Sequence, residues 1–318
     1  MRALRSLLIV GALVALPLGA QESAAPSAAP ENVDIITPHI TDSYHLEVPW
    51  ILPPFAKEVC IGRHVGEEAC EPLWEPVNIA GKSVNLSPTK HVVMLLFAAL
   101  LVSVVLIGSA RAHARHTHAH GHPKGFAGAI EAMVLYIRNE VILPNVGHHG
   151  NSFVPFLLTI FFFILTANLL GLIPYGSTAT GNIAVTATLA LISFVVVEIA
   201  GMRALGAHYL ETIFYWNKDL SFPIRVLMFL IMSPVELIGK FTKLFALAIR
   251  LFANMTAGHI VLLAFVGLIF TFSSIVSTAP FLMAIAISML ELFVAFLQAF
   301  IFTLLSSVFI GQIREAHH

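Results

Sequence analysis

The sequence predicts an all-α polytopic membrane protein with about five membrane crossings. Of its 318 residues, 58% are hydrophobic and 11% are charged, and the mean hydropathy is +0.87. Soluble domains carry about 25% charged residues, so this chain has less than half of the usual share. Several long runs contain almost no charge, which is the pattern of membrane-spanning helices. The formal net charge of -1 gives no reason to expect nucleic-acid binding.

The N-terminal residues have the pattern of a secretory signal followed by a linker. In residues 1–20, Arg2 and Arg5 precede an apolar run that is too short to span a bilayer comfortably. Leu18 is a mediocre fit three positions before the expected cleavage point, so an uncleaved anchor is the alternative. Residues 21–31 are rich in Ala, Ser and Pro, which predicts a flexible linker.

Residues 32–88 predict a small N-terminal domain with short strands, for example at 33–36 and 44–48. If the signal is interpreted correctly, this domain lies outside the cytoplasm. It contains Cys60 and Cys70, the only two cysteines of the chain. An oxidising compartment favours a disulfide between them, which would contribute roughly 2 to 3 kcal/mol for so short a loop. Two free thiols are the alternative.

Residues 89–318 form the predicted membrane domain. Its five apolar stretches are long enough to cross a bilayer, with spans expected at about 91–110, 153–174, 183–205, 223–272 and 280–311. Basic residues follow the first span and mark the stretch from the end of the third span to the start of the fourth, and the positive-inside rule places them in the cytoplasm: Arg111, Arg115, Lys124, Arg203, Lys218 and Arg225. The N-terminus is therefore expected outside and the C-terminus in the cytoplasm.

One stretch of this domain, 125–142, has apolar residues at helical spacing but is too polar to span. It predicts an amphipathic helix on the membrane surface. The last two spans are too long to stand upright, since 223–272 would reach ~75 Å against a hydrocarbon core of ~30 Å. We therefore expect strong tilting, or a break near Pro234. No internal repeat is evident, which weakens a transporter built on inverted repeats.

The most informative residue is Arg250, a permanent charge deep in an apolar stretch. A charge at that depth costs from ~2.5 to more than ~10 kcal/mol, so Arg250 is expected to face a polar cavity or an acidic partner. At about 100° per residue it shares one helical stripe with small and polar residues, namely Lys243, Ala246, Ala253, Asn254 and Ala257. The small residues would let another helix approach closely.

A second group of polar residues points to proton transfer. Glu291 and Gln298 are seven positions apart on the last helix and share a face. His259, whose side chain titrates near neutrality, lies nine residues after Arg250, roughly on the opposite side of a straight helix. A carboxyl and an imidazole on two helices form a credible proton relay. For Asn254 and Gln298, interhelical hydrogen bonding is an equally good interpretation.

Residues 246–259, ALAIRLFANMTAGH, resemble the signature of subunit a of the F-type ATP synthase. The segments Asn168 to Pro174, Pro234 to Glu236 and Leu297 to Phe302 are similar to others of that family, in the same order. The resemblance covers about residues 85–315. It implies a proton-translocating stator subunit of a bacterial inner membrane, which forms two half-channels against a rotating c-ring. Subunit b, the rest of the F1Fo complex and membrane lipid are the other partners that it implies.

By position, the resemblance implies that Arg250 faces the carboxylate of the c-ring. It implies that the two half-channels use five further polar residues: Asn254, His259, Glu291, Gln298 and Glu236. In some bacterial members of the family, a Glu stands at the position of His259 and a His at the position of Glu291. Here the two are exchanged, in the arrangement of mitochondrial members. The chain is expected to hold no cofactor or metal and to have no enzymatic activity by itself, since it lacks a G-x-x-x-x-G-K-[ST] phosphate loop.

Alternatives remain at this point. A stand-alone proton-coupled secondary transporter could use the His259/Glu291 pair, and a non-conducting assembly subunit is a weaker third class. Protons are the expected ion, because no dedicated sodium ligands are evident.

Several other polar residues have simple interpretations. The histidine tract of residues 113–122 matches no zinc pattern and is expected to be a solvated loop. Lys240 and Lys243 are expected to be interfacial anchors. Glu198 is expected to be a helix-end residue paired with Arg203.

Overall fold

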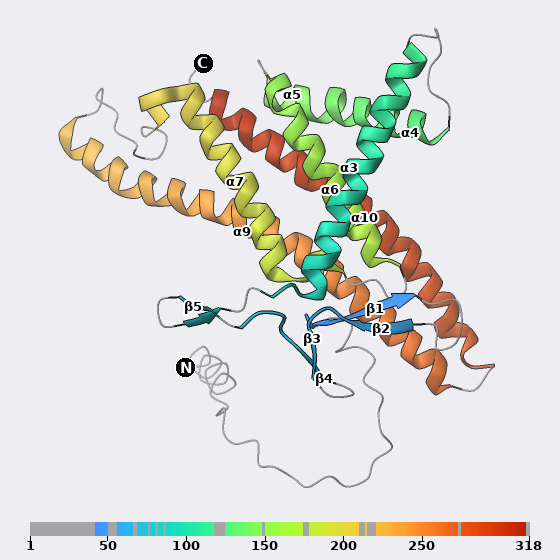
Figure 1. The fold of residues 1–318 in the computed structure, drawn as a ribbon. Helices are drawn as coiled ribbons and strands as arrows, with labels where there is room; N and C mark the ends of the chain where they lie inside the picture. Colours follow the sequence, from blue (N-terminus) through green and yellow to red (C-terminus); the bar gives the residue numbers. More distant parts are fainter. Residues whose placement is uncertain are drawn as a thin grey trace, which may run out of the picture. The chain divides into compact units, whose positions relative to one another are not determined.

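A computed structural model describes most of the chain downstream of residue 41 (Figure 1). The described residues are 42–49, 56–65, 69–75, 77–79, 82–84, 87–117, 125–147, 150–173, 178–209, 214, 221–272 and 275–315. The predicted signal, the linker and the strand expected at 33–36 lie outside these residues.

The described part of the N-terminal domain consists of short antiparallel hairpins. Their strands pair in sequence order: β1 (His45–Pro49) with β2 (Ala56–Cys60), β3 (Arg63–Val65) with β4 (Ala69–Glu71), and β5 (Val77–Ile79) with β6 (Lys82–Val84). The strand expected at 44–48 is therefore present as β1. Cys60 and Cys70 form a disulfide that joins the first two hairpins, with their Cα atoms 5.8 Å apart.

Five helices in the described residues are long and apolar enough to cross a membrane, which confirms the all-α polytopic class. They are α3 (Lys90–Thr117), α6 (Val154–Gly171), α7 (Ile183–Leu205), α9 (Phe222–Thr271) and α10 (Thr278–Glu315). Two short 3₁₀ turns flank α7, with η3 (Ala179–Gly181) before it and η4 (Gly206–His208) after it.

A polar-faced helical segment lies between α3 and α6, where the amphipathic helix is expected. It comprises α4 (Phe126–Tyr136), a π-helical stretch η1 (Ile137–Ile142) and α5 (Leu143–Val146), followed by the turn η2 (Gly150–Ser152). The helical path thus runs four residues beyond the expected end at 142. The apolar residues Ile130, Ile137 and Val141 are buried, as the helical spacing predicts.

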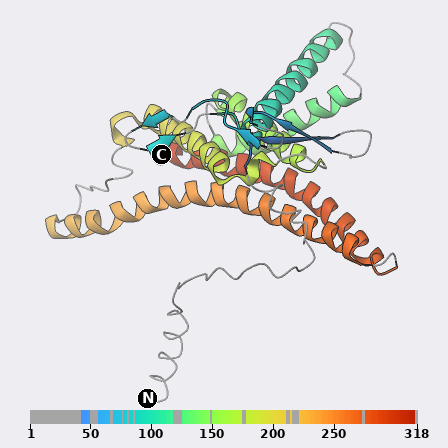
Figure 2. The same cartoon turned by 60° about the horizontal axis from the view of Figure 1, so that its bottom comes forward.

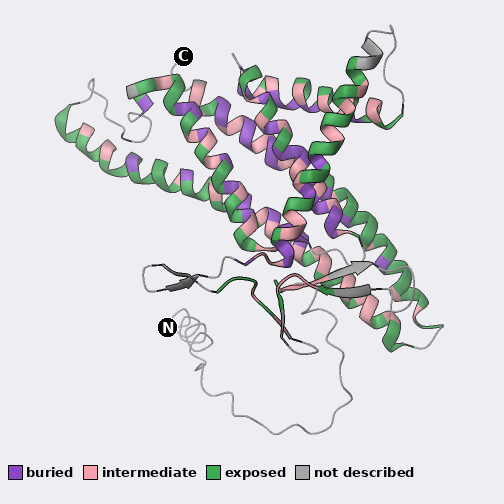
Figure 3. Cartoon of the chain, in the orientation of Figure 1, coloured by how far each residue is buried: buried purple, intermediate pink, exposed green. Residues whose placement is uncertain are grey.

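Helix α6 supplies the largest share of the core, and α7, α9, α10 and the α4–α5 segment pack their buried residues around it (Figure 3). Helix α6 is apolar on every side, which is typical of a helix surrounded by others. Its Leu157 and Ile164 are 0% exposed, as are Phe302 of α10 and Ile142 of η1. At Gly311 of α10 an added Cβ would collide with the backbone carbonyl of Asn145, so glycine permits the close contact between α10 and α5.

Helix α9 runs for 50 residues without a break, through Pro234 (Figure 2). The break considered for Pro234 is therefore absent, and the helix is gently curved instead. One narrow face of α9 is buried, formed by Ser233, Lys240, Leu247, Ala248, Leu251 and Met255. Large apolar residues elsewhere on the helix are exposed, including Phe241, Phe245 and Ile249. Such a surface suits lipid or another apolar chain.

Candidate functional site

The second half of α9 and the facing part of α10 share a seam that holds polar side chains. Nδ2 of Asn254 donates a hydrogen bond of 2.8 Å to Oε1 of Gln298, so two residues predicted separately are brought together. Gln298 is 1% exposed. Its Nε2 forms no hydrogen bond with the described residues, so the seam keeps one further donor beside Asn254.

One turn further along α9, Glu291 of α10 rests on Gly258. A Cβ added to Gly258 would lie 2.5 Å from Oε1 of Glu291 and 3.1 Å from its Cγ. Glu291 is 8% exposed, and its Oε2 has no hydrogen-bond partner in the part of the chain that the structure describes. His259 is the next residue after Gly258 and is partly buried. The structure thus brings the carboxyl of Glu291 to the turn of α9 that carries His259.

Arg250 is half-buried at the edge of the packed face of α9. Its neighbour Leu251 is 0% exposed, whereas the small residues Ala246, Ala253 and Ala257 of the predicted stripe are exposed. Arg250 forms no hydrogen bond or ion pair with the residues that the structure describes. The acidic partner expected for it is therefore not found in the described part of this chain, and its charge lies beside a surface that another chain can reach.

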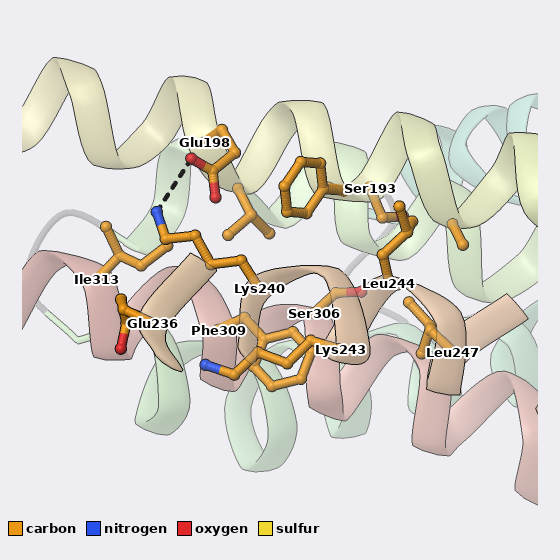
Figure 4. A pocket seen from close by; sticks show the side chains of 13 residues that line it. Ser193, Glu198, Glu236, Lys240, Lys243, Leu244, Leu247, Ser306, Phe309 and Ile313 are labelled. Atoms are coloured by element: carbon orange, nitrogen blue, oxygen red, sulfur yellow. Dashed lines mark hydrogen bonds and ion pairs between the residues drawn. The ribbon is translucent and has the colours of Figure 1, made fainter. Parts of the chain in front are cut away.

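The first half of α9 lines a cavity between α7, α9 and α10, with about 480 Å³ of empty space including its open mouth (Figure 4). Glu236 and Lys243 line it from α9, Ser193 from α7 and Ser306 from α10. The hydroxyls of Ser193 and Ser306 are buried and have no hydrogen-bond partner among the described residues. Glu236, which is exposed, therefore lines a mixed polar and apolar cavity that shares no lining residue with the α9/α10 seam.

The wall of this cavity contains a buried ion pair between α7 and α9. Nζ of Lys240 lies 3.2 Å from Oε2 of Glu198 and donates a 2.6 Å hydrogen bond to the hydroxyl of Tyr209. Lys240 is 7% exposed, so its interpretation as an interfacial anchor is wrong. The pairing of Glu198 with Arg203 is also wrong, because residues five apart on a helix point about 140° away from each other.

Arg250 lies between the two polar regions along the axis of α9. It follows Glu236 by fourteen residues and precedes His259 by nine, which corresponds to ~21 Å and ~14 Å of helix. The cavity with Glu236 therefore lies N-terminal to Arg250 along α9, and the seam with His259 lies C-terminal to it.

Further hydrogen bonds hold the seam in place. Oγ1 of Thr180 donates to Oδ1 of Asn168 at 2.8 Å, and Nδ2 of Asn168 donates to the carbonyl of Ala295 at 3.4 Å. Oγ1 of Thr256 donates to the carbonyl of Gly181 at 3.4 Å. These links tie α6, η3, α9 and α10 together. The signal that could have found Asn168 is its amide in an otherwise apolar span.

The histidine tract falls only partly within the described residues. Nδ1 of His113 lies 3.2 Å from Oε1 of Glu131 and so joins α3 to α4. His118, His120 and His122 lie outside the described residues, and no group of three or more metal-ligating side chains occurs within them.

Fold and site together define a multi-pass membrane protein with charged and polar side chains within its apolar helices. A family model described as ATP synthase A chain matches residues 91–311. The chain belongs to this family, whose members are the proton-translocating stator subunits of ATP synthase and not enzymes by themselves. The functional expectation and the resemblance are thereby confirmed.

Curated relatives support this assignment. The chain is 46% identical over 246 residues to ATP synthase subunit a 2 of Chlorobaculum tepidum, which is 76% of this chain and 66% of that relative. It is 47% identical over 237 residues to ATP synthase subunit a of Chloroherpeton thalassium, covering 74% of this chain and 68% of the relative. For the subunit of Anaeromyxobacter sp., identity is 39% over 294 residues, with 88% and 70% covered.

Proposed function

We propose that protons cross the membrane through two half-channels of this chain, on either side of Arg250. The inlet is the α9/α10 seam with Asn254, Gln298, His259 and Glu291. The outlet is the cavity that Glu236 lines. The observation that carries this proposal is the position of Arg250, which separates the two polar regions along one helix and has no partner in the described part of the chain.

The partner of Arg250 is proposed to be the carboxylate of a c-ring subunit passing the exposed stripe of α9. The small side chains of Ala246, Ala253 and Ala257 allow a neighbouring helix to come close. The guanidinium then stabilises the ionised form of that carboxylate and repels a proton moving directly from one half-channel to the other. A proton must therefore leave the seam on the rotor and reach the cavity only after rotation.

In the inlet, His259 and Glu291 are proposed to hand protons to the rotor. An imidazole can gain a proton on one nitrogen and release one from the other, so it can pass a charge without moving far. The carboxyl of Glu291 can accept and return a proton within hydrogen-bond reach of such a donor. Asn254 and Gln298 are proposed to orient the path through their mutual hydrogen bond.

The orientation is proposed with the strands outside and the C-terminus in the cytoplasm of a bacterial inner membrane. The disulfide of Cys60 and Cys70 suits an oxidising compartment. Arg111 and Arg115 follow the other end of the apolar part of α3, as cytoplasmic residues do. The c-ring and subunit b are proposed as direct partners.

Isolation of the chain from native membranes tests this function. A tagged chain is expected to co-purify with an oligomeric ring of small hairpin subunits, and vesicles containing the complex are expected to acidify when ATP is added. A stand-alone transporter predicts instead that the purified chain alone moves protons in liposomes. Recovery of an active chain without the ring would contradict the proposal.

Replacing Gly258 with alanine tests the inlet. The new Cβ would overlap Oε1 of Glu291, so the carboxyl must move by about 1 Å. We expect proton-driven ATP synthesis to fall between about tenfold and about hundredfold, the cost of misplacing a reacting group by that distance. Gly267 on the same helix has open space around it, and Gly267→Ala is the matched control. Equal rates for the two variants would rule out this role for the contact.

A further inference from the structure

The N-terminal end of α3 is joined to the segment that precedes β1. The backbone N–H of Lys90 donates to the carbonyl of Ser43 at 2.9 Å. Nδ1 of His91 lies 2.9 Å from Oδ1 of Asp42. The side chain of His91 is 3% exposed, whereas that of Asp42 is 31% exposed. The imidazole is thus buried, and the carboxylate that it contacts is partly exposed.

Nδ1 of His91 has a second neighbour, Nδ2 of Asn182, at 3.4 Å. The two contacts need different protonation states of the same atom. Nδ1 must carry a proton to donate to the carboxylate of Asp42, and it must lack one to accept from the amide of Asn182. A change of protonation at His91 thus exchanges an outward partner for an inward one.

The inward partner connects His91 structurally to the helix that carries the seam, although its amide N–H donates and cannot itself accept a proton. Asn182 forms the N-cap of α7, since its Oδ1 accepts from the backbone N–H of Ala184 at 2.9 Å. Gly181, the preceding residue, accepts the hydrogen bond of Thr256 on α9. Thr256 is three residues before His259, so both lie on one face of α9. The turn η3 that contains Gly181 contacts α3, α6, α7 and α9.

Among the described residues, Asp42 faces His91 from the segment before β1, and Lys90 precedes it on α3. Helix α6 and the turn η3, which pack against α3, contain no titratable side chain, and the first turns of α7 contain none. Burial alone would raise the pKa of Asp42, but hydrogen bonds from His91 and Thr89 and the charge of His91 lower it below its ordinary value.

We propose that Asp42 and His91 form the outer proton port of the inlet half-channel. A proton from the outside water binds Oδ1 of Asp42 and passes to Nδ1 of His91. The O–H bond breaks as the N–H bond forms, and the carboxylate that is regenerated pairs with the imidazolium. This inference rests on the proposed half-channels, and it gives the segment before the family-matched residues 91–311 a direct role in proton uptake.

The test is ATP synthesis by the complete complex in liposomes, with the pH varied between about 6 and about 8 on the side of the strands. In the Asp42→Asn variant, synthesis is expected to fall most at high outside pH and least at low outside pH, because the port loses the partly exposed carboxylate that collects protons from the outside water. His91→Gln is expected to remove this pH dependence. Asp42→Glu is expected to restore it.

Glu131→Gln is the matched control, because Glu131 forms the same type of pair with His113 at the other end of α3. Its pH profile is expected to be unchanged. An Asp42→Asn profile that superimposes on that of the unchanged protein would overturn the inference, and so would an equal loss of rate at every pH. Arg250→Ala is measured in the same liposomes. If it abolishes synthesis while Asp42→Asn has no effect, the inference fails and the half-channels stand; if Arg250→Ala retains synthesis, the proposed function itself fails.

Discussion

Replacement of Arg250 with alanine is expected to reduce proton-driven ATP synthesis to background while the complex still assembles. The charge contributes no described contact within the chain, so its loss should not weaken the packing of α9. At ~4 Å and an effective dielectric constant of ~20, its attraction for a rotor carboxylate is ~4 kcal/mol, or about a thousandfold in equilibrium population. Synthesis in reconstituted vesicles is the measurement, together with passive proton leakage, which is expected to rise.

Arg203→Ala is the control for this experiment. Arg203 is an exposed arginine in the last turn of α7 and lies outside both polar regions. Its replacement is expected to leave synthesis unchanged. Vesicles that still make ATP from a proton gradient with alanine at position 250 would rule out the barrier role of the arginine.

The second large effect is expected from Lys240→Met. This change leaves the carboxylate of Glu198, which is 19% exposed, without its cation and removes the hydrogen bond to Tyr209. Breaking one side of a fully buried ion pair costs about 3 kcal/mol or more, and the partial exposure of Glu198 makes about 3 kcal/mol the upper end of the expected loss. The midpoint of thermal unfolding of the purified protein in detergent should fall accordingly. Lys243→Met is the comparison, since Lys243 is exposed on the same helix.

A double variant distinguishes the contribution of the Lys240–Glu198 ion pair from that of the packing of the lysine side chain. Lys240→Met combined with Glu198→Leu leaves no unpaired charge, so most of the lost stability should return. If the double variant is as unstable as Lys240→Met alone, the packing of the lysine stem and not its charge holds α7 to α9. This outcome would contradict our account of the cavity wall.

Much of the fold could be predicted because apolar length and charge position leave few alternatives. The five membrane helices follow from the length of the apolar stretches, and the buried face of α4 and η1 follows from helical periodicity. The continuity of α9 could not be predicted, because a proline such as Pro234 kinks or merely curves a helix depending on what packs beside it. The extension of the surface helix to Val146 depends likewise on its contact with α10.

The residues of the candidate site likewise fall into those that the sequence could identify and those that it could not. Arg250 and Glu291 could be identified from the cost of polar groups in apolar helices. The partner of Glu198 could not, because Lys240 is 42 residues away and only the tertiary structure brings α7 to α9. The contact of Glu291 with Gly258 could not be predicted either, because glycine in a membrane helix can serve several kinds of close packing.

The unbroken course of α9 fixes the angular relation between the residues proposed for the outlet, the barrier and the inlet. Along one regular helix, Glu236 lies about 40° from the direction of Arg250, and His259 lies about 180° from it. Inserting or deleting a single residue anywhere between positions 236 and 259 would rotate one of these groups by about 100° relative to the others. The number of residues between Glu236, Arg250 and His259 is therefore constrained by the helix itself, because any single insertion or deletion would move one of the three to another face.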